Sequence, residues 1–125
     1  MTFLLDENIS HLVADALKAL GKPVAYVTDI LPRGADDVTL FGQLGQLDWF
    51  LVTQDQKIRR KKHELEAMRQ AGIGAFIFTG RANKTVERMT IMILEHFDEI
   101  QKLAQQTPRP FIFGISDRGS VDRLD

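Results

Sequence analysis

The chain has 125 residues, of which 44% are apolar and 26% are charged, and this size and mixture are typical of one globular domain. The 16 Lys and Arg side chains nearly balance the 17 Asp and Glu side chains, so the formal net charge of −1 argues against a chain coated in positive charge for nucleic acid or an anionic membrane. The absence of cysteine excludes disulfides, thiol nucleophiles, Cys-ligated zinc sites and iron–sulfur clusters.

Short apolar runs alternate with helical patterns along the chain. The apolar runs predict five strands, over residues 2–5, 24–28, 49–53, 75–79 and 111–115. Apolar residues spaced three or four positions apart predict four helices, over residues 9–20, 37–47, 56–71 and 84–105. Strands that are apolar throughout suit a parallel sheet that is buried on both faces. The order of elements therefore predicts an α/β fold, a single three-layer domain around a central, mostly parallel five-stranded sheet.

The two ends of the chain differ in character. We expect the domain to cover residues 1–115, and the polar, charged residues 116–125 to form a mobile C-terminal tail. No apolar run is long enough to cross a bilayer. The early acids Asp6 and Glu7 do not fit a signal peptide. Together with the lack of cysteine, these features predict a cytoplasmic protein with no membrane partner.

Acidic side chains follow the predicted strands. Asp6 follows the first strand, Asp37 begins the helix after the second, and Asp55 follows the third. In sheets of this type, functional sites lie beyond the carboxyl ends of the strands. Carboxylates that meet there repel one another unless a cation neutralises them, and oxygen ligands favour magnesium or manganese. The alternative is that such acids only cap helices, as Asp36 and Asp55 could do.

A basic run comes directly after Asp55. It consists of Lys57, Arg59, Arg60, Lys61 and Lys62. Such a run is either a solvated helix face or a clamp for a phosphate backbone, which positions a nucleic acid without specifying its sequence. Arg33 and Arg81 follow other predicted strands and would extend the same positive edge.

Three short motifs stand at strand ends in a distinctive order. Residues 3–8 are FLLDEN, residues 33–37 are RGADD, and residues 51–55 are LVTQD. They resemble the LLDEN-type first strand, the RGxxD element and the VTxD strand end of PIN-like domains, over roughly residues 1–106. The resemblance implies the fold of a metal-dependent ribonuclease, often the toxin of a VapBC-type toxin–antitoxin pair.

The resemblance also assigns roles to particular residues. Asp6, Asp37 and Asp55 match the first, second and third acids of the metal site, and Thr53 matches the hydroxyl residue that supports it. Asp36 is a rival for the second acid, because one residue along a helix turns a side chain by about 100°. Glu7 is expected to be a structural partner of the site.

The chain departs from the family pattern after the third acid. Many members have a further acid two residues beyond it, where this chain has Lys57. A fourth carboxylate is then absent, or is supplied from elsewhere, with Asp29 as a candidate. One magnesium or manganese ion held by three carboxylates and waters remains compatible with this pattern.

The leading hypothesis is therefore a magnesium- or manganese-dependent endoribonuclease that cleaves RNA phosphodiester bonds. The residues expected to hold the RNA are Arg33, Lys57, Arg59, Arg60 and Lys61. The resemblance also implies a cognate antitoxin protein and a homodimer as partners. One alternative is a catalytically silent PIN-like domain that binds RNA or protein. The other is a phospho-receiver domain, which the strand-end acids fit but the lack of a Lys after the fifth strand does not.

Overall fold

The computed structural model describes residues 1–81 and 83–125, and the side chains of Ile58 and Arg59 lie outside the described part. The strands are β1 (Phe3–Leu5), β2 (Val24–Tyr26), β3 (Phe50–Thr53), β4 (Gly74–Phe78), β5 (Phe111–Ile115) and β6 (Val121–Arg123). The α-helices are α1 (His11–Ala19), α2 (Asp37–Leu47), α3 (Lys62–Ala71) and α4 (Val86–Gln106). Two short 3-10 helices are η1 (Val27–Asp29) and η2 (Gln56–Arg59).

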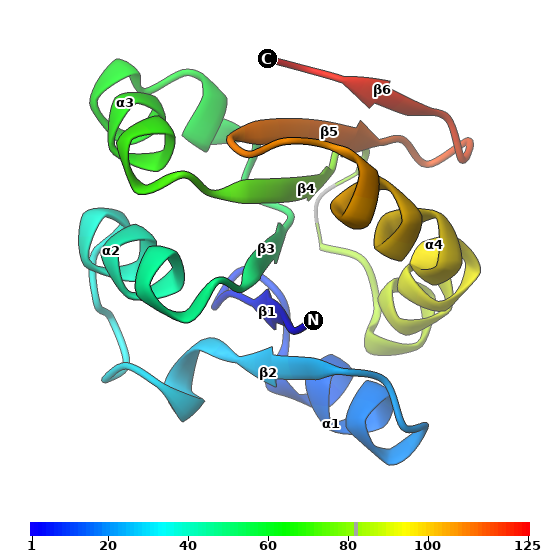
Figure 1. The fold of residues 1–125 in the computed structure, drawn as a ribbon. Coiled ribbons are helices and arrows are strands. Elements are labelled where there is room, and N and C mark those ends of the chain that lie inside the picture. The colour runs from blue at the N-terminus through cyan, green and yellow to red at the C-terminus, as the bar shows by residue number, and fades with distance from the viewer. Residues whose placement is uncertain (82) are drawn as a thin grey trace.

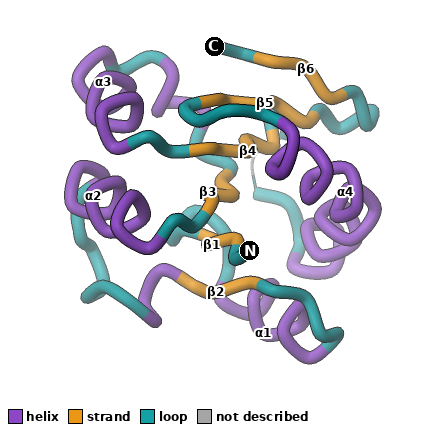
Figure 2. The backbone as a smooth tube through the Cα atoms, in the orientation of Figure 1, coloured by secondary structure: helices purple, strands orange, loops and turns teal. Residues whose placement is uncertain are grey.

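All six strands belong to one sheet, in the order β2-β1-β3-β4-β5-β6 (Figure 1). Neighbouring strands are parallel from β2 to β5, and β6 pairs with β5 in the antiparallel direction. The helices α1 and α4 cover one face of the sheet, and α2 and α3 cover the other (Figures 1 and 2). This is the predicted three-layer α/β architecture, with one strand more than expected.

Each face of the sheet has its own core, because successive side chains in a strand point to opposite faces. Aromatic residues dominate the core beneath α1 and α4. Its strand members include Phe3, Phe50, Phe76, Phe78, Phe111 and Phe113. Smaller aliphatic strand residues pack beneath α2 and α3, among them Leu4, Leu51, Ala75, Ile77 and Ile112. Nearly every residue of β1 to β5 is buried, which confirms the reasoning from their unbroken apolar runs. The edge strand β6 is half-buried to exposed.

The helix predicted over residues 56–71 is divided into η2 and α3. Asp55 Oδ1 accepts a hydrogen bond from the Lys57 backbone N–H at 2.9 Å, and the backbone at Lys61 is extended. Residues 57–61 still form one turn, in which the Lys61 N–H donates to the Lys57 carbonyl at 3.1 Å. The extended backbone at Lys61 then ends this turn, and α3 begins at Lys62, within the basic run.

The expectation of a mobile C-terminal tail was wrong. Residues 116–120 turn back along the sheet, and Val121 pairs with Ile115 in the β5–β6 register. Leu124 packs against the core beneath α2 and α3 and lies over Gly114. Asp125 Oδ1 accepts the Ile112 N–H at 3.1 Å. Val121 and Leu124, which flank Asp122 and Arg123, give the segment apolar contacts with the cores on the two faces of the sheet.

None of the described helices is long and apolar enough to cross a membrane.

If the C-terminal hairpin is part of the folded core, removing one apolar anchor lowers stability. We expect Leu124→Ala to reduce the free energy of unfolding by about 1–2 kcal/mol, because a half-buried leucine loses its contacts. The matched control is Leu12→Ala, at a leucine that is 50% exposed on α1, with an expected effect below about 0.5 kcal/mol. Urea denaturation measures both variants, and equal values would mean that the segment behaves as a free tail.

Candidate functional site

Two acids lie side by side at the carboxyl edge of the sheet. Asp6 directly follows β1 and Asp55 lies two residues beyond β3, and these strands are parallel neighbours, with Leu5 opposite Val52. The Asp6 N–H also donates to the Val52 carbonyl at 3.4 Å. The topology therefore brings the first and third predicted acids to one edge, as the sequence indicated.

Asp6 is the most buried acid of this edge, with 6% of its surface exposed. Its Oδ1 accepts the Asn8 N–H at 3.1 Å. The pKa of Asp6 is raised from an ordinary value of 3.8 to about 7, chiefly by burial. Hydrogen bonds from Thr53 and Asn8 act to lower this pKa, and the charges of Asp55 and Asp37 act to raise it. Asp6 is thus a carboxyl group whose charge the folded protein does not compensate.

Asn8 and Thr53 form a hydrogen-bonded support beneath the acids. With its nitrogen turned toward the carboxylate, the Asn8 amide donates to both Asp6 oxygens at 2.9 and 3.0 Å and to Thr53 Oγ1 at 3.0 Å. The buried Thr53 Oγ1 also accepts the Asp55 N–H at 2.9 Å. Thr53 therefore lies where a supporting hydroxyl residue was expected. The supporting role of Asn8 was not predicted, although its position in the first motif, two residues after Asp6, was a signal for it.

Two further acids, Asp37 and Glu64, come from α2 and α3, the helices that cover one face of the sheet. Asp37 is the first residue of α2, and Glu64 lies in the first turn of α3. The pKa of Asp37 is raised, first by burial, then by the charges of Glu64 and Asp55, and by the close approach of the Glu64 carboxyl. Lys61 Nζ approaches Glu64 Oε1 at 3.5 Å. The other oxygen, Glu64 Oε2, is buried and has no hydrogen-bond partner in the described part of the chain.

We refer to Asp6, Asp37, Asp55 and Glu64 as the acidic cluster. Its carboxylate oxygens are the hard ligands that magnesium and manganese prefer. The unpartnered Glu64 oxygen and the uncompensated Asp6 carboxyl both fit a nearby divalent cation. Among the described residues, however, no three acidic or histidine side chains are close enough together to hold a metal ion as they stand. The donor set fits a cation, and coordination would require the side chains to move closer to one another.

Glu64 was not foreseen from the sequence. Glu64 lies one helical turn before Met68 on α3, and Met68 is the buried residue of that helix. An acid on the buried side of a helix is unusual unless it has a partner, and this placement was the available signal. Which carboxylate it would meet depends on how α2 packs against α3, and no local pattern gives that.

Three other acids have structural partners. Asp36 caps α2, since its Oδ1 accepts the Thr39 N–H at 2.7 Å, and it is exposed. Asp29 binds Lys18 Nζ at 2.8 Å and accepts the Tyr26 N–H at 2.9 Å, so it does not supply the fourth carboxylate of the cluster. Glu7 accepts the Gly34 N–H at 2.8 Å and so fixes the loop that leads to α2.

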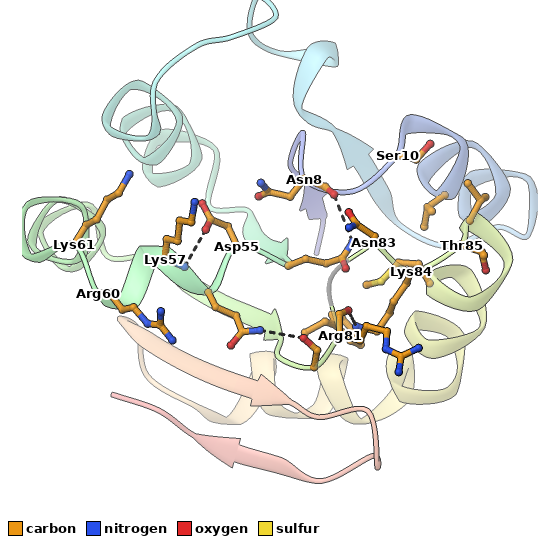
Figure 3. A pocket seen from close by; sticks show the side chains of 17 residues that line it. Asn8, Ser10, Asp55, Lys57, Arg60, Lys61, Arg81, Asn83, Lys84 and Thr85 are labelled. Atoms are coloured by element: carbon orange, nitrogen blue, oxygen red, sulfur yellow. Dashed lines mark hydrogen bonds between the residues drawn. The ribbon is translucent and has the colours of Figure 1, made fainter.

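A cleft of about 760 Å³ opens beside Asp55, between η2 and the start of α4 (Figure 3). The cationic residues that line it are Lys57, Arg60, Lys61, Arg81 and Lys84. Asp55 is the only acid among its described lining residues. The basic run therefore faces this cleft over part of its length, next to the acidic cluster.

Two of the expected cations are not placed in this cleft. Arg33 lines a separate hollow of about 470 Å³ beside Glu7, His11 and Tyr26. The loop at Gly34 turns toward Glu7, and this contact directs Arg33 to the β2 side. The Arg59 side chain lies outside the described residues.

A family model described as a PIN like domain matches residues 1–80. No curated protein and no solved structure matches the chain. The matched region contains β1 to β4 and all four members of the acidic cluster, whereas α4, β5 and β6 lie beyond it.

The raised pKa of Asp6 predicts how stability depends on pH in the metal-free protein. The unfolded carboxyl loses its proton near pH 3.8, but the folded one keeps it until about pH 7. The contribution of Asp6 to the free energy of unfolding is therefore most favourable below pH 4. It falls by up to about 4 kcal/mol as the pH rises to 7. Asp6→Asn should remove this fall in urea denaturation measured from pH 4 to 8, while the exposed-site control Asp98→Asn keeps it. An unchanged slope in Asp6→Asn would contradict the assignment.

Proposed function

Because the chain belongs to the PIN-like domain family, we propose that it is a magnesium- or manganese-dependent endoribonuclease that hydrolyses RNA phosphodiester bonds. PIN-like domains are commonly nucleases. The observation that carries the proposal is the buried, uncompensated Asp6 carboxyl within an acidic cluster, of which Asp55 lines a cleft rich in cations. Carboxylates for a metal and cations for phosphates are the two requirements of this chemistry.

Within the acidic cluster, Asp6, Asp37 and Asp55 are proposed as the metal-holding residues. The preference for Asp37 over Asp36 rests on their different surroundings. Asp37 is half-buried and near Asp55 and Glu64, whereas Asp36 is exposed and bonded to Thr39. When bound, the metal would supply an activated water and would stabilise negative charge on the phosphate.

The remaining residues orient these acids. Asn8 and Thr53 hold Asp6 and the backbone at Asp55 in place by the hydrogen bonds described above. Glu64 is proposed as the fourth carboxylate of the site. It would replace the further acid that many family members have at the position of Lys57, because a lysine cannot bind a cation. The unpartnered buried oxygen of Glu64 supports this role, since a desolvated carboxylate oxygen needs a donor or a cation.

The cations hold the substrate. Lys57, Arg60 and Lys61 line the cleft beside Asp55 and are proposed to contact the RNA backbone, with Arg59 as the remaining cation of the run. Arg33 is no longer included, because it lines the other hollow. Contacts of this kind neutralise phosphates and leave base selection to other groups.

A catalytically silent RNA-binding domain is the second candidate. The separation of the acids supports it, since no three of the described side chains are gathered for a metal. The phospho-receiver hypothesis is not retained, because the family match is to PIN-like domains and no Lys follows β5 directly.

As a cellular role we propose the toxin of a type II toxin–antitoxin system, with a cognate antitoxin and a homodimer as the assembled forms. An unrestrained ribonuclease would damage its own cell, so an inhibitor is expected. An antitoxin that places an Arg near the acidic cluster would meet four carboxylates there. Growth arrest on expression, relieved by the product of a neighbouring gene, is the observation that tests this role.

Adjacent acids provide a matched test of the metal site. We expect Asp37→Asn to lower manganese-dependent cleavage of an RNA oligonucleotide by at least 100-fold, because one metal-holding carboxylate is lost. Asp36→Asn should stay within about threefold of the original protein, since Asn caps a helix as well as Asp does. The cleavage rates of the two purified variants show which of the two residues is the second acid of the metal site. The reverse order would make Asp36 the second acid, and a lack of cleavage in the original protein would favour the silent domain.

Glu64 is tested by metal binding rather than by cleavage. Glu64→Gln keeps the size of the side chain but removes its charge, so we expect manganese affinity to fall about 10- to 100-fold. Glu66→Gln, on the exposed side of the same helix, is the control and should bind as the original protein does. Isothermal titration with manganese chloride gives both values, and equal affinities would exclude Glu64 from the site.

A further inference from the structure

One wall of the cleft lies beyond the region matched by the family model. The near wall is η2 with the end of β3, within residues 1–80. The far wall is formed by the connection from β4 to α4 and includes Arg81, Lys84 and Thr85 (Figure 3). The properties of this wall therefore have to be argued from this chain's own contacts.

A single carboxylate on the β5–β6 turn holds the far wall. Asp117 accepts the Arg81 N–H at 2.8 Å and pairs with Lys84 Nζ at 3.1 Å. The carboxylate also lies directly against Gly80, where an added Cβ would sit 2.2 Å from Asp117 Cγ. Asp117 thus contacts both ends of the connection at once.

The Lys84 side chain is held by its contacts with Asp117 and with the Arg81 carbonyl. It is only 5% exposed, and besides pairing with Asp117 it donates to the Arg81 carbonyl. A buried ammonium with these two partners is fixed in place and is not available to a ligand. Among the described side chains that line the cleft, the exposed cations without an ion-pair partner are therefore Arg81 on the far wall and Lys57 and Arg60 on the near wall.

The two walls are also joined to each other. Gln56 Nε2, on η2, donates to the Gly80 carbonyl at 3.2 Å (Figure 3). Gly80 is thus the point at which the near wall, the far wall and the C-terminal hairpin meet. A displacement of the hairpin would move Arg81 relative to Asp55.

We propose that Asp117 is a positioning residue for RNA, which fixes the backbone at Arg81 so that Arg81 and Arg60 bind phosphates on opposite walls of the cleft. The scissile phosphate then lies beside Asp55, the single acid of the lining. This inference rests on the proposed ribonuclease function and adds the path of the substrate to it. It also gives the C-terminal hairpin a role in binding.

The test compares Asp117→Ala with Asp122→Ala, an exposed acid on the same hairpin. Both variants remove one negative charge, so electrostatics alone predicts slightly tighter RNA binding in each. The positioning role predicts instead that Asp117→Ala binds RNA about tenfold more weakly, whereas Asp122→Ala does not. Fluorescence anisotropy with a single-stranded RNA oligonucleotide, in an Asp6→Asn background that prevents cleavage, measures the affinities. Unchanged or tighter binding in Asp117→Ala would overturn the proposal.

Two milder variants keep the test decisive if Asp117→Ala does not fold. Asp117→Asn retains an acceptor for the Arg81 N–H and should recover part of the affinity. Arg81→Ala should weaken binding and reduce the slope of log K against log salt concentration by about 0.7, the value for one phosphate on a single strand. An unchanged slope in Arg81→Ala would place the RNA elsewhere.

The outcomes separate this inference from the ribonuclease proposal. If the Asp6→Asn protein binds no RNA, the proposed function itself fails. If it binds RNA but ignores the changes at Asp117 and Arg81, only the path through the cleft is wrong. Binding of an acidic protein partner, and not RNA, that depends on Arg81 would show that the cleft is a protein site and would overturn the inference. Manganese titration should be unaffected by all variants at Asp117.

Discussion

The constraint on which the site depends is the burial of Asp6 at the end of a central strand. β1 lies between β2 and β3, so the residue that follows it is flanked by strands on both sides and is buried. The fold supplies hydrogen bonds from Asn8 and Thr53, yet the pKa of Asp6 still rises because burial outweighs them. A charged group that a fold buries without full compensation lowers stability, and such groups are concentrated where they serve binding or catalysis.

The distribution of charge follows from this constraint. Asp55, just beyond β3, and Asp37 on α2 repel Asp6, and Glu64 on α3 repels Asp37, so the acids raise one another's pKa within the cluster. Most of the cations line the adjacent cleft, and Lys61, which also pairs with Glu64, lies at the border between the two groups. The formal net charge of −1 therefore does not reveal that acids and cations gather in neighbouring regions of this edge. A total near zero, which at first argued against nucleic acid, is compatible with a negative site beside a positive path.

The predictable parts of the protein are those with a local or topological cause. Strand positions follow from apolar runs, and the meeting of Asp6 with Asp55 follows from parallel strands whose carboxyl ends share an edge. Glu64, the division of the basic run and the direction of Arg33 depend on packing between distant elements or on a single contact such as Glu7 with Gly34. β6 was missed because a short edge strand with alternating charges offers few apolar residues to a pattern search.

The way in which Asp117 holds the far wall has a consequence for substrate choice. Its contacts with the Arg81 N–H and with Gly80 are made to the main chain, so they do not depend on which side chain follows Gly80. The wall can thus keep its position while the group that it presents to the cleft changes. The acidic cluster lies wholly within the region shared with the family, and this wall lies beyond it. The acidic cluster and the far wall of the cleft are therefore built on separate supports, joined at Gly80 by the hydrogen bond from Gln56.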